Sequence, residues 1–113
     1  MFHMLSCFNL QEGVSAGALD EALKVFAAVM QEKQLLVSVS PIGHRDSDTE
    51  MDTDEERAHE YFYIMSFEDK KQCDDAYDFI DNPTKEALAA HMTVVSKIQD
   101  NIHICWEDIQ ARP

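Results

Sequence analysis

The segment at residues 2–10 constrains the fold most, because it has the composition of a β-strand with no charged face. One of its faces is apolar apart from Ser6. The other face is half apolar and half reactive and consists of His3, Leu5, Cys7 and Asn9. A strand in a sheet that is covered on one side alternates apolar residues with polar ones. We therefore expect both faces to be covered, one by helices of the same chain and the other by a second copy of the chain.

The length of 113 residues fits one domain with a sizeable core. We assign this domain to residues 1–109 and regard 110–113 as a tail. No apolar run reaches the roughly 20 residues needed to span a bilayer, and the N-terminus lacks the features of a signal peptide. The three cysteines, Cys7, Cys73 and Cys105, do not have zinc-ligand spacing. They predict reduced thiols and a cytoplasmic protein.

The net charge of −13 argues against two classes of partner. A nucleic-acid backbone would be repelled, and the chain has no Lys/Arg cluster to offset the repulsion. An anionic membrane surface is disfavoured for the same reason. The acidic composition instead indicates solubility.

Much of this charge lies in an expected surface loop at 43–58, the acidic loop. Nearly every second residue from Asp46 to Glu56 is acidic, which is typical of an exposed, mobile segment. An EF-hand calcium loop starting at Asp46 is the alternative. It fails because Met51 stands where glycine is needed and Arg57 stands where a bidentate glutamate is needed.

Hydrophobic spacing predicts four strands and three helices. The strands are expected at 2–10, 35–40, 61–67 and 102–106, and the helices at 16–33, 67–81 and 83–98. Ser15, Ser66 and Asn82 are the expected N-caps. The apolar stripe expected on the last helix consists of Ala87, Leu88, His91, Val95 and Ile98.

This order of elements predicts a ferredoxin-like α+β fold, βαββααβ, with a four-stranded antiparallel sheet and helices on one face. The first strand is then central, between the third and the fourth. The helix side is expected to carry Phe2, Met4, Phe8, Ile102, Ile104 and Trp106. The opposite face is expected to carry His3, Leu5, Cys7, Ser38, Ser40, Tyr61, Tyr63, Met65, His103 and Cys105. Such a partly apolar face marks an interface, so two copies would close into a barrel with a pocket inside.

Short motifs along the chain match a known superfamily. They are His3-x-Leu5-x-Cys7 at the start, Phe67 at the end of the third strand and Pro83 between the last two helices. On these residues the chain resembles the dimeric α/β-barrel superfamily, especially its stress-responsive A/B barrel proteins. Small monooxygenases are related members of the same superfamily. The resemblance implies a homodimer and a barrel-lining position for His3. It also implies proton transfer or cofactor-free oxidation if the protein is an enzyme.

The chain departs from the members of this superfamily that have cyclase activity. Those members carry a tyrosine four residues before the proline and a histidine two residues after it, where this chain has Phe79 and Lys85. The cyclase reaction is therefore not expected. The sequence also shows no Ser–His–Asp pattern, glycine-rich phosphate loop or HExxH motif, and we expect no cofactor.

Histidine is the side chain that titrates near neutral pH without perturbation, so the candidate catalytic bases are His3, His103 and His91. The expected ligand contacts are Leu5, Cys7, Tyr61, Tyr63 and Cys105. Antiparallel pairing is expected to place His3 near Cys105 or Glu107, and His103 near Cys7 or Asn9. No metal site is expected there, because strict ligand spacing is missing. His44 and His59, beside the acidic loop, are expected to be solvated.

Two functions remain open at this point. The first is a homodimer that binds a small apolar or aromatic metabolite inside the barrel, with or without transforming it. The second is a non-catalytic dimer that engages a partner protein through the acidic loop.

Overall fold

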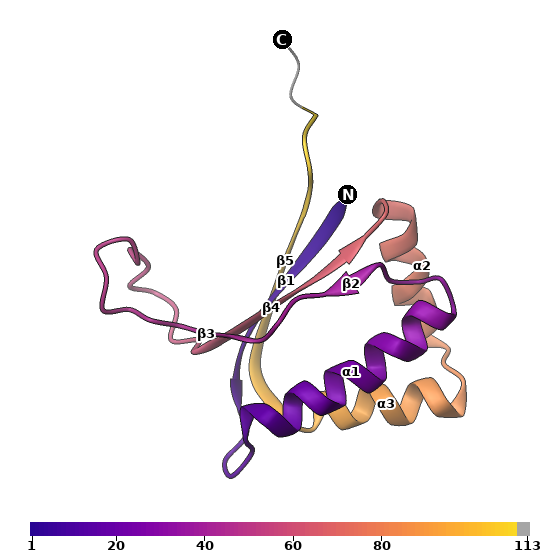
Figure 1. The fold of residues 1–113 in the computed structure, drawn as a ribbon, viewed down its shortest axis with the longest axis horizontal. Helices are drawn as coiled ribbons and strands as arrows, with labels where there is room; N and C mark the ends of the chain where they lie inside the picture. The colour runs from indigo at the N-terminus through magenta and orange to yellow at the C-terminus, as the bar shows by residue number, and fades with distance from the viewer. Residues whose placement is uncertain (111–113) are drawn as a thin grey trace.

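The computed structural model describes residues 1–110 as one antiparallel sheet with three helices on one side (Figure 1). The strands are β1 (Phe2–Leu10), β2 (Ser38–Val39), β3 (Gly43–His44), β4 (Tyr61–Phe67) and β5 (Ile98–Glu107). The helices are α1 (Ala16–Glu32), α2 (Lys70–Asp81) and α3 (Lys85–Val95). None of these three helices is long and apolar enough to cross a membrane.

The strand order is β2-β4-β1-β5, with every neighbouring pair antiparallel, and β3 also pairs with β4. The prediction of a ferredoxin-like α+β fold with a central first strand is confirmed. The strand count is five instead of four. Pro41 follows the strand expected at 35–40 and has no amide hydrogen to donate, so the ladder with β4 is interrupted there. The chain therefore pairs with β4 twice, at Ser38–Val39 and again at Gly43–His44.

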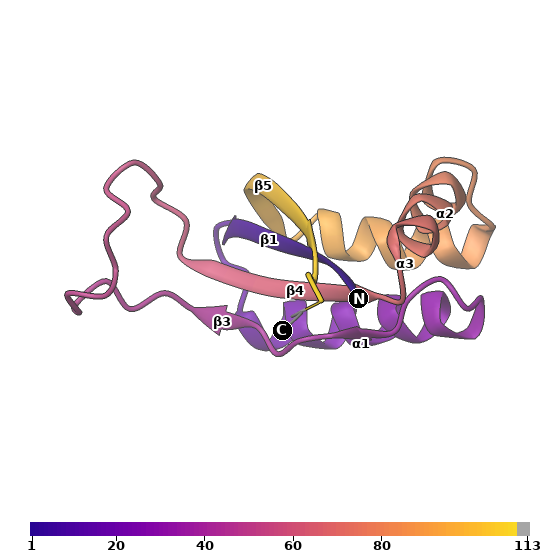
Figure 2. The same cartoon turned by 90° about the horizontal axis from the view of Figure 1, so that it is seen from above.

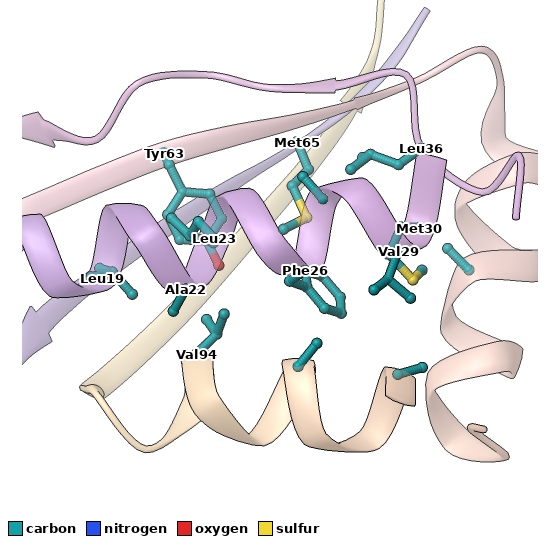
Figure 3. Close-up of a cluster of buried hydrophobic side chains, with 14 of the residues drawn as sticks. Leu19, Ala22, Leu23, Phe26, Val29, Met30, Leu36, Tyr63, Met65 and Val94 are labelled. Carbon is teal, nitrogen blue, oxygen red and sulfur yellow. The ribbon is translucent and has the colours of Figure 1, made fainter. Parts of the chain in front are cut away.

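The core lies between the sheet and an amphipathic α1. The buried side chains of α1 are Leu19, Ala22, Leu23, Phe26, Ala27, Val29 and Met30 (Figure 3). Ser15 caps this helix as expected, and its hydroxyl accepts a 3.1 Å hydrogen bond from the Ala18 amide. Phe8, toward the end of β1, is fully buried against the rings of Tyr61 and Tyr63.

Two helix starts were predicted wrongly. The N-cap of α2 is Asp69 instead of Ser66, and that of α3 is Thr84 instead of Asn82. The face that α3 buries also differs from the expected stripe. It consists of Ala87, Ala90 and Val94, while Leu88 and Val95 are exposed. A shift of one position turns the buried face of a helix by about 100°, because one turn takes about 3.6 residues.

The register of β5 against β1 corrects the expected division of the sheet faces. Ser6 lies opposite both Tyr63 and His103, so these three side chains share the helix side. Alternate residues of a strand share one face, so the helix side also carries Tyr61, Met65 and Cys105. The prediction had placed these three residues on the opposite face. Conversely, Ile102, Ile104 and Trp106 lie on the face away from the helices. A slip of one residue moves every side chain of a strand to the other face.

We call the face away from the helices the open face. Three cross-strand rows make it up: Trp106–His3–Ser66–Ser38, Ile104–Leu5–Ile64 and Ile102–Cys7–Phe62. The predicted positions of His3, Leu5, Cys7 and Ser38 on this face are confirmed. The single-domain assignment to 1–109 stays a prediction, and the expected tail falls outside the described residues except for residue 110.

Candidate functional site

A cavity of about 260 Å³ lies between the helix side of the sheet and helices α1 and α2. Its walls are Met4, Phe26, Met30, Leu36, Met65, Phe67, Cys73, Asp74, Ala76, Tyr77, Ile80 and Cys105. Figure 3 shows Met65 extending from β4 toward α1, and Phe26 on the side of α1 that is turned toward α3. Asp74 is the one charged side chain in this lining, so the cavity is an apolar space.

A row of polar side chains crosses the sheet beside this cavity. Ser6 is buried, and its hydroxyl is joined to Nδ1 of His103 by a 2.9 Å hydrogen bond. Tyr63 lies on the other side of Ser6, and burial raises the pKa of the Tyr63 hydroxyl. Met4 and Cys105 of the cavity wall each lie two residues along their strand from Ser6 and His103. This spacing corresponds to about 7 Å.

His103 is the histidine of this row. The neighbouring residues of β5 are exposed. Partial burial of its ring lowers the pKa of His103 below the usual histidine value. The imidazole is therefore neutral at neutral pH and able to accept a proton. His91 on α3 also has a pKa lowered by desolvation, and its ring packs 5.4 Å from that of Phe26 in the cavity wall.

His3 lies on the open face, separated from His103 and His91 by the sheet. Its Nδ1 is 2.8 Å from the Ser66 hydroxyl, and its Nε2 is 3.0 Å from both carboxylate oxygens of Asp108. The hydrogen bond from His3 holds the pKa of Asp108 below its usual range. The residue opposite His3 on β5 is Trp106, so the expected neighbours Cys105 and Glu107 were wrong by one position.

The candidate residues therefore form two groups instead of one pocket. His103, Tyr61, Tyr63 and Cys105 lie on the helix side, whereas His3, Leu5 and Cys7 lie on the open face. Burial raises the pKa of the Cys7 thiol, which keeps that thiol protonated. Within residues 1–110 no three His, Cys, Asp or Glu side chains come together as metal ligands.

The acidic loop, expected at 43–58, spans residues 45–60 because residues 43 and 44 form β3, and it projects beyond the end of the sheet (Figure 2). Arg45 organises it by donating two 2.7 Å hydrogen bonds to the Asp52 carboxylate and two more to the carbonyls of Asp54 and Arg57. His59 is buried, not solvated as expected, and its Nε2 bonds the Asp100 carbonyl at 2.7 Å. The loop is therefore a folded substructure held from its base.

Arg45→Gln is expected to loosen the acidic loop without unfolding the domain, because a glutamine cannot make the paired contact with Asp52. Cleavage within the loop by a glutamate-specific protease should become several-fold faster, while the urea midpoint stays nearly unchanged. Arg57→Gln is the matched control, since Arg57 makes a single exposed ion pair with Asp54 and should change cleavage less. Equal cleavage rates in the two variants would contradict the organising role of Arg45.

Several residues of these groups could not be identified from the sequence alone. Ser66 and Asp108 meet His3 only through the pairing of distant strands. Ser6 gave a visible signal, because it is the one polar residue on the apolar face of β1. A buried hydroxyl needs a hydrogen-bond partner, and here the partner is His103.

No protein-family model and no curated protein sequence matches the chain. Solved structures do match it. A protein of Arabidopsis thaliana superposes with a TM-score of 0.73 over 100% of both chains at 11% identity. SnoaB, a cofactor-independent oxygenase from Streptomyces nogalater, gives a TM-score of 0.64 at 12% identity over 99% of this chain and 96% of its own. A dimeric ferredoxin-like protein of unknown function from Jannaschia sp. CCS1 gives 0.61 at 16% identity over 95% and 98%.

Similarity at these identities concerns the fold. The chain has the ferredoxin-like α+β fold of these proteins, and its resemblance to dimeric α/β-barrel proteins is confirmed at that level.

Proposed function

We propose that the protein is a homodimer in which each subunit binds a small apolar or aromatic molecule in the cavity between its sheet and its helices. The observation that carries the binding proposal is the apolar lining of this cavity next to the Ser6–His103 hydrogen bond. Small-molecule sites combine mainly apolar walls with a few polar groups.

Support for the dimer comes from the open face. Ile102, Ile104 and Trp106 are all exposed on it, and Leu5, Phe62 and Ile64 extend the apolar surface across the sheet. A contiguous apolar patch of this kind is typical of an interaction surface. Proteins with the same fold from Bacteroides fragilis and from Jannaschia are described as dimeric. A second copy of the chain is therefore the proposed cover.

The size of the cavity limits the proposed ligand. Its volume of about 260 Å³ lies just below the range of roughly 300–1,000 Å³ that is common for ligand sites. A ligand of one or two aromatic rings is the class that fits. Larger hollows of about 470 and 360 Å³ lie along the acidic loop, but charged side chains that already pair with each other line much of them.

His103 is the proposed proton acceptor if the bound molecule reacts. It is neutral at neutral pH, and Ser6 fixes the orientation of its ring. Tyr63, on the other side of Ser6, would orient the ligand. Proton abstraction at this position would suit the cofactor-free chemistry proposed from the resemblance, and SnoaB of the same fold is a cofactor-independent oxygenase.

Ala76→Met tests the binding site by filling it. Ala76 is buried on α2 and lines the cavity, so a methionine there would occupy the proposed ligand space. Binding of naphthol, a fluorescent aromatic alcohol, should become about 5- to 150-fold weaker, because fitting the ligand beside the added methionine would overpack the site at a cost of about 1–3 kcal/mol. The measurement is a fluorescence titration with the dimeric protein.

Ala89→Met is the matched control, because Ala89 lies on the exposed side of α3 and the exchange is the same. It should leave naphthol binding unchanged. Naphthol binding that is equal in both variants, or absent from the unmodified protein, would contradict the site.

The alternative is a non-catalytic dimer that engages a partner through the acidic loop. Two of its carboxylates, Asp52 and Asp54, are already paired with Arg45 and Arg57. This pairing lowers the charge that the loop can offer to a partner. We therefore favour ligand binding in the cavity.

A further inference from the structure

The open face carries a hydrogen-bonded series of side chains that the cavity does not use. Ser66 near the end of β4 lies opposite His3 at the start of β1, and the side chain of Asp108, just after β5, reaches the same histidine. The Ser66 hydroxyl is 2.8 Å from Nδ1 of His3, and Nε2 of His3 is 3.0 Å from each carboxylate oxygen of Asp108. Serine, histidine and aspartate are thus joined in the order that activates a serine nucleophile, an arrangement that the sequence pattern did not reveal.

The carboxylate decides which nitrogen of His3 carries the proton. Asp108 is ionised at neutral pH, because its hydrogen bond from His3 lowers its pKa. A carboxylate only accepts hydrogen bonds, so the neutral ring must place its proton on Nε2. The free lone pair is then on Nδ1 and points at the Ser66 hydroxyl. This is the tautomer that a general base for Ser66 requires.

The rest of the site holds the base in place and leaves it accessible. The Trp106 ring lies 5.2 Å from the His3 ring, and the Met1 amine is 3.4 Å from the Asp108 carboxylate. The side chains of His3 and Asp108 are 17% and 53% exposed. The cluster sits at the start of β1, at the rim of the open face, so a second copy covering the middle of the sheet would leave an approach from the side.

We propose that Ser66, His3 and Asp108 form an acyl-transfer site for small, uncharged, activated carboxylic esters. Trp106 offers an apolar surface for the organic group of the ester. Ser38 lies directly opposite Ser66 on the same face, where its hydroxyl can donate to the ester carbonyl oxygen as negative charge develops there. The net charge of −13 disfavours anionic esters.

The proposed reaction has two balanced halves. Ser66 Oγ bonds to the carbonyl carbon while its proton passes to Nδ1 of His3. The ester C–O bond then breaks, and the departing alcohol takes that proton and leaves an acyl-Ser66. Water next attacks the acyl group and gives one proton to His3. The carboxylic acid departs as Ser66 recovers its proton from His3.

The test is reaction of the full chain with p-nitrophenyl acetate. We expect a burst of p-nitrophenol, and peptide mapping by mass spectrometry should find one acetyl group on Ser66 of the unmodified protein. Ser66→Ala should abolish this label and the burst. His3→Gln should slow acylation by about a hundredfold or more, because general-base catalysis contributes roughly 10²–10⁴-fold.

Asp108 is a positioning residue, so its test is a pH profile. In Asp108→Asn the carboxylate no longer fixes the tautomer, and the rate of Ser66 acylation should fall and follow a different pH dependence. Ser47→Ala, in the exposed acidic loop, is the control and should leave the rate unchanged. Acetyl groups found only on lysines or on the Met1 amine of the unmodified protein would overturn the proposal. A Ser66 label that forms equally fast in His3→Gln would also overturn it.

Discussion

Ile104→Glu is expected to convert the dimer into monomers. Ile104 is 45% exposed at the middle of β5 and lies opposite Leu5 in the central row of the open face. In the proposed dimer this row is buried, and a carboxylate placed there would lose its water without gaining a partner. Sedimentation velocity at micromolar concentration should show a single species with the protomer mass and a native circular dichroism spectrum.

Val25→Glu is the matched control for this variant. Val25 is 58% exposed on α1, on the helix layer and away from the open face. The same change of an exposed aliphatic residue to glutamate should leave the dimer intact there. Dissociation by Val25→Glu with a persistent Ile104→Glu dimer would place the interface on the helices and contradict the covered sheet.

Phe8→Ala is expected to cause the largest loss of stability. The Phe8 side chain is 0% exposed, and its ring packs 5.4 Å from that of Tyr63 and 6.1 Å from that of Tyr61. Removing a buried phenylalanine side chain costs about 3–5 kcal/mol, through lost burial and the cavity left behind. Chemical denaturation should show this as a lower free energy of unfolding.

Leu88→Ala provides the comparison, because Leu88 is 48% exposed on α3 although the sequence pattern placed it in the buried stripe. Its effect should stay below about 1 kcal/mol, as for most surface substitutions. A Leu88→Ala loss as large as that of Phe8→Ala would show that α3 packs through the predicted stripe after all.

Local sequence signals predicted the order of the elements well. Residues 2–10 have the composition of a strand covered on both faces, and β1 occupies the centre of the sheet. The Ser15 cap and the periodic apolar residues after it located α1. These signals act within one element, where side-chain spacing and capping are set by neighbouring residues.

The division of residues between the two faces could not be predicted with the same success. Ile102, Ile104 and Trp106 are as apolar as any core strand, so they were assigned to the helix side, yet they face away from it. From Ile102 to Trp106 neither face of β5 carries a charged residue. The sequence pattern alone therefore does not show which face of this strand turns toward the helices. The choice is made by the register with β1, which is a property of two distant segments.

The candidate sites show the same limit. His3 and His103 were both identified as functional candidates, but they lie on opposite faces of the sheet. Each of them forms a hydrogen bond with a different serine. Asp108, just after the last strand, reaches His3 only because β1 and β5 are antiparallel neighbours. Residue types suggested the chemistry, whereas pairing decided which residues act together.

Sedimentation equilibrium of the unmodified protein at low micromolar concentration tests whether a second copy of the chain covers the open face of the sheet. The expected result is a stable species of twice the protomer mass of 12.9 kDa. A well-folded species of 12.9 kDa under these conditions would leave Ile104 and Ile102 in water and contradict the proposed dimer.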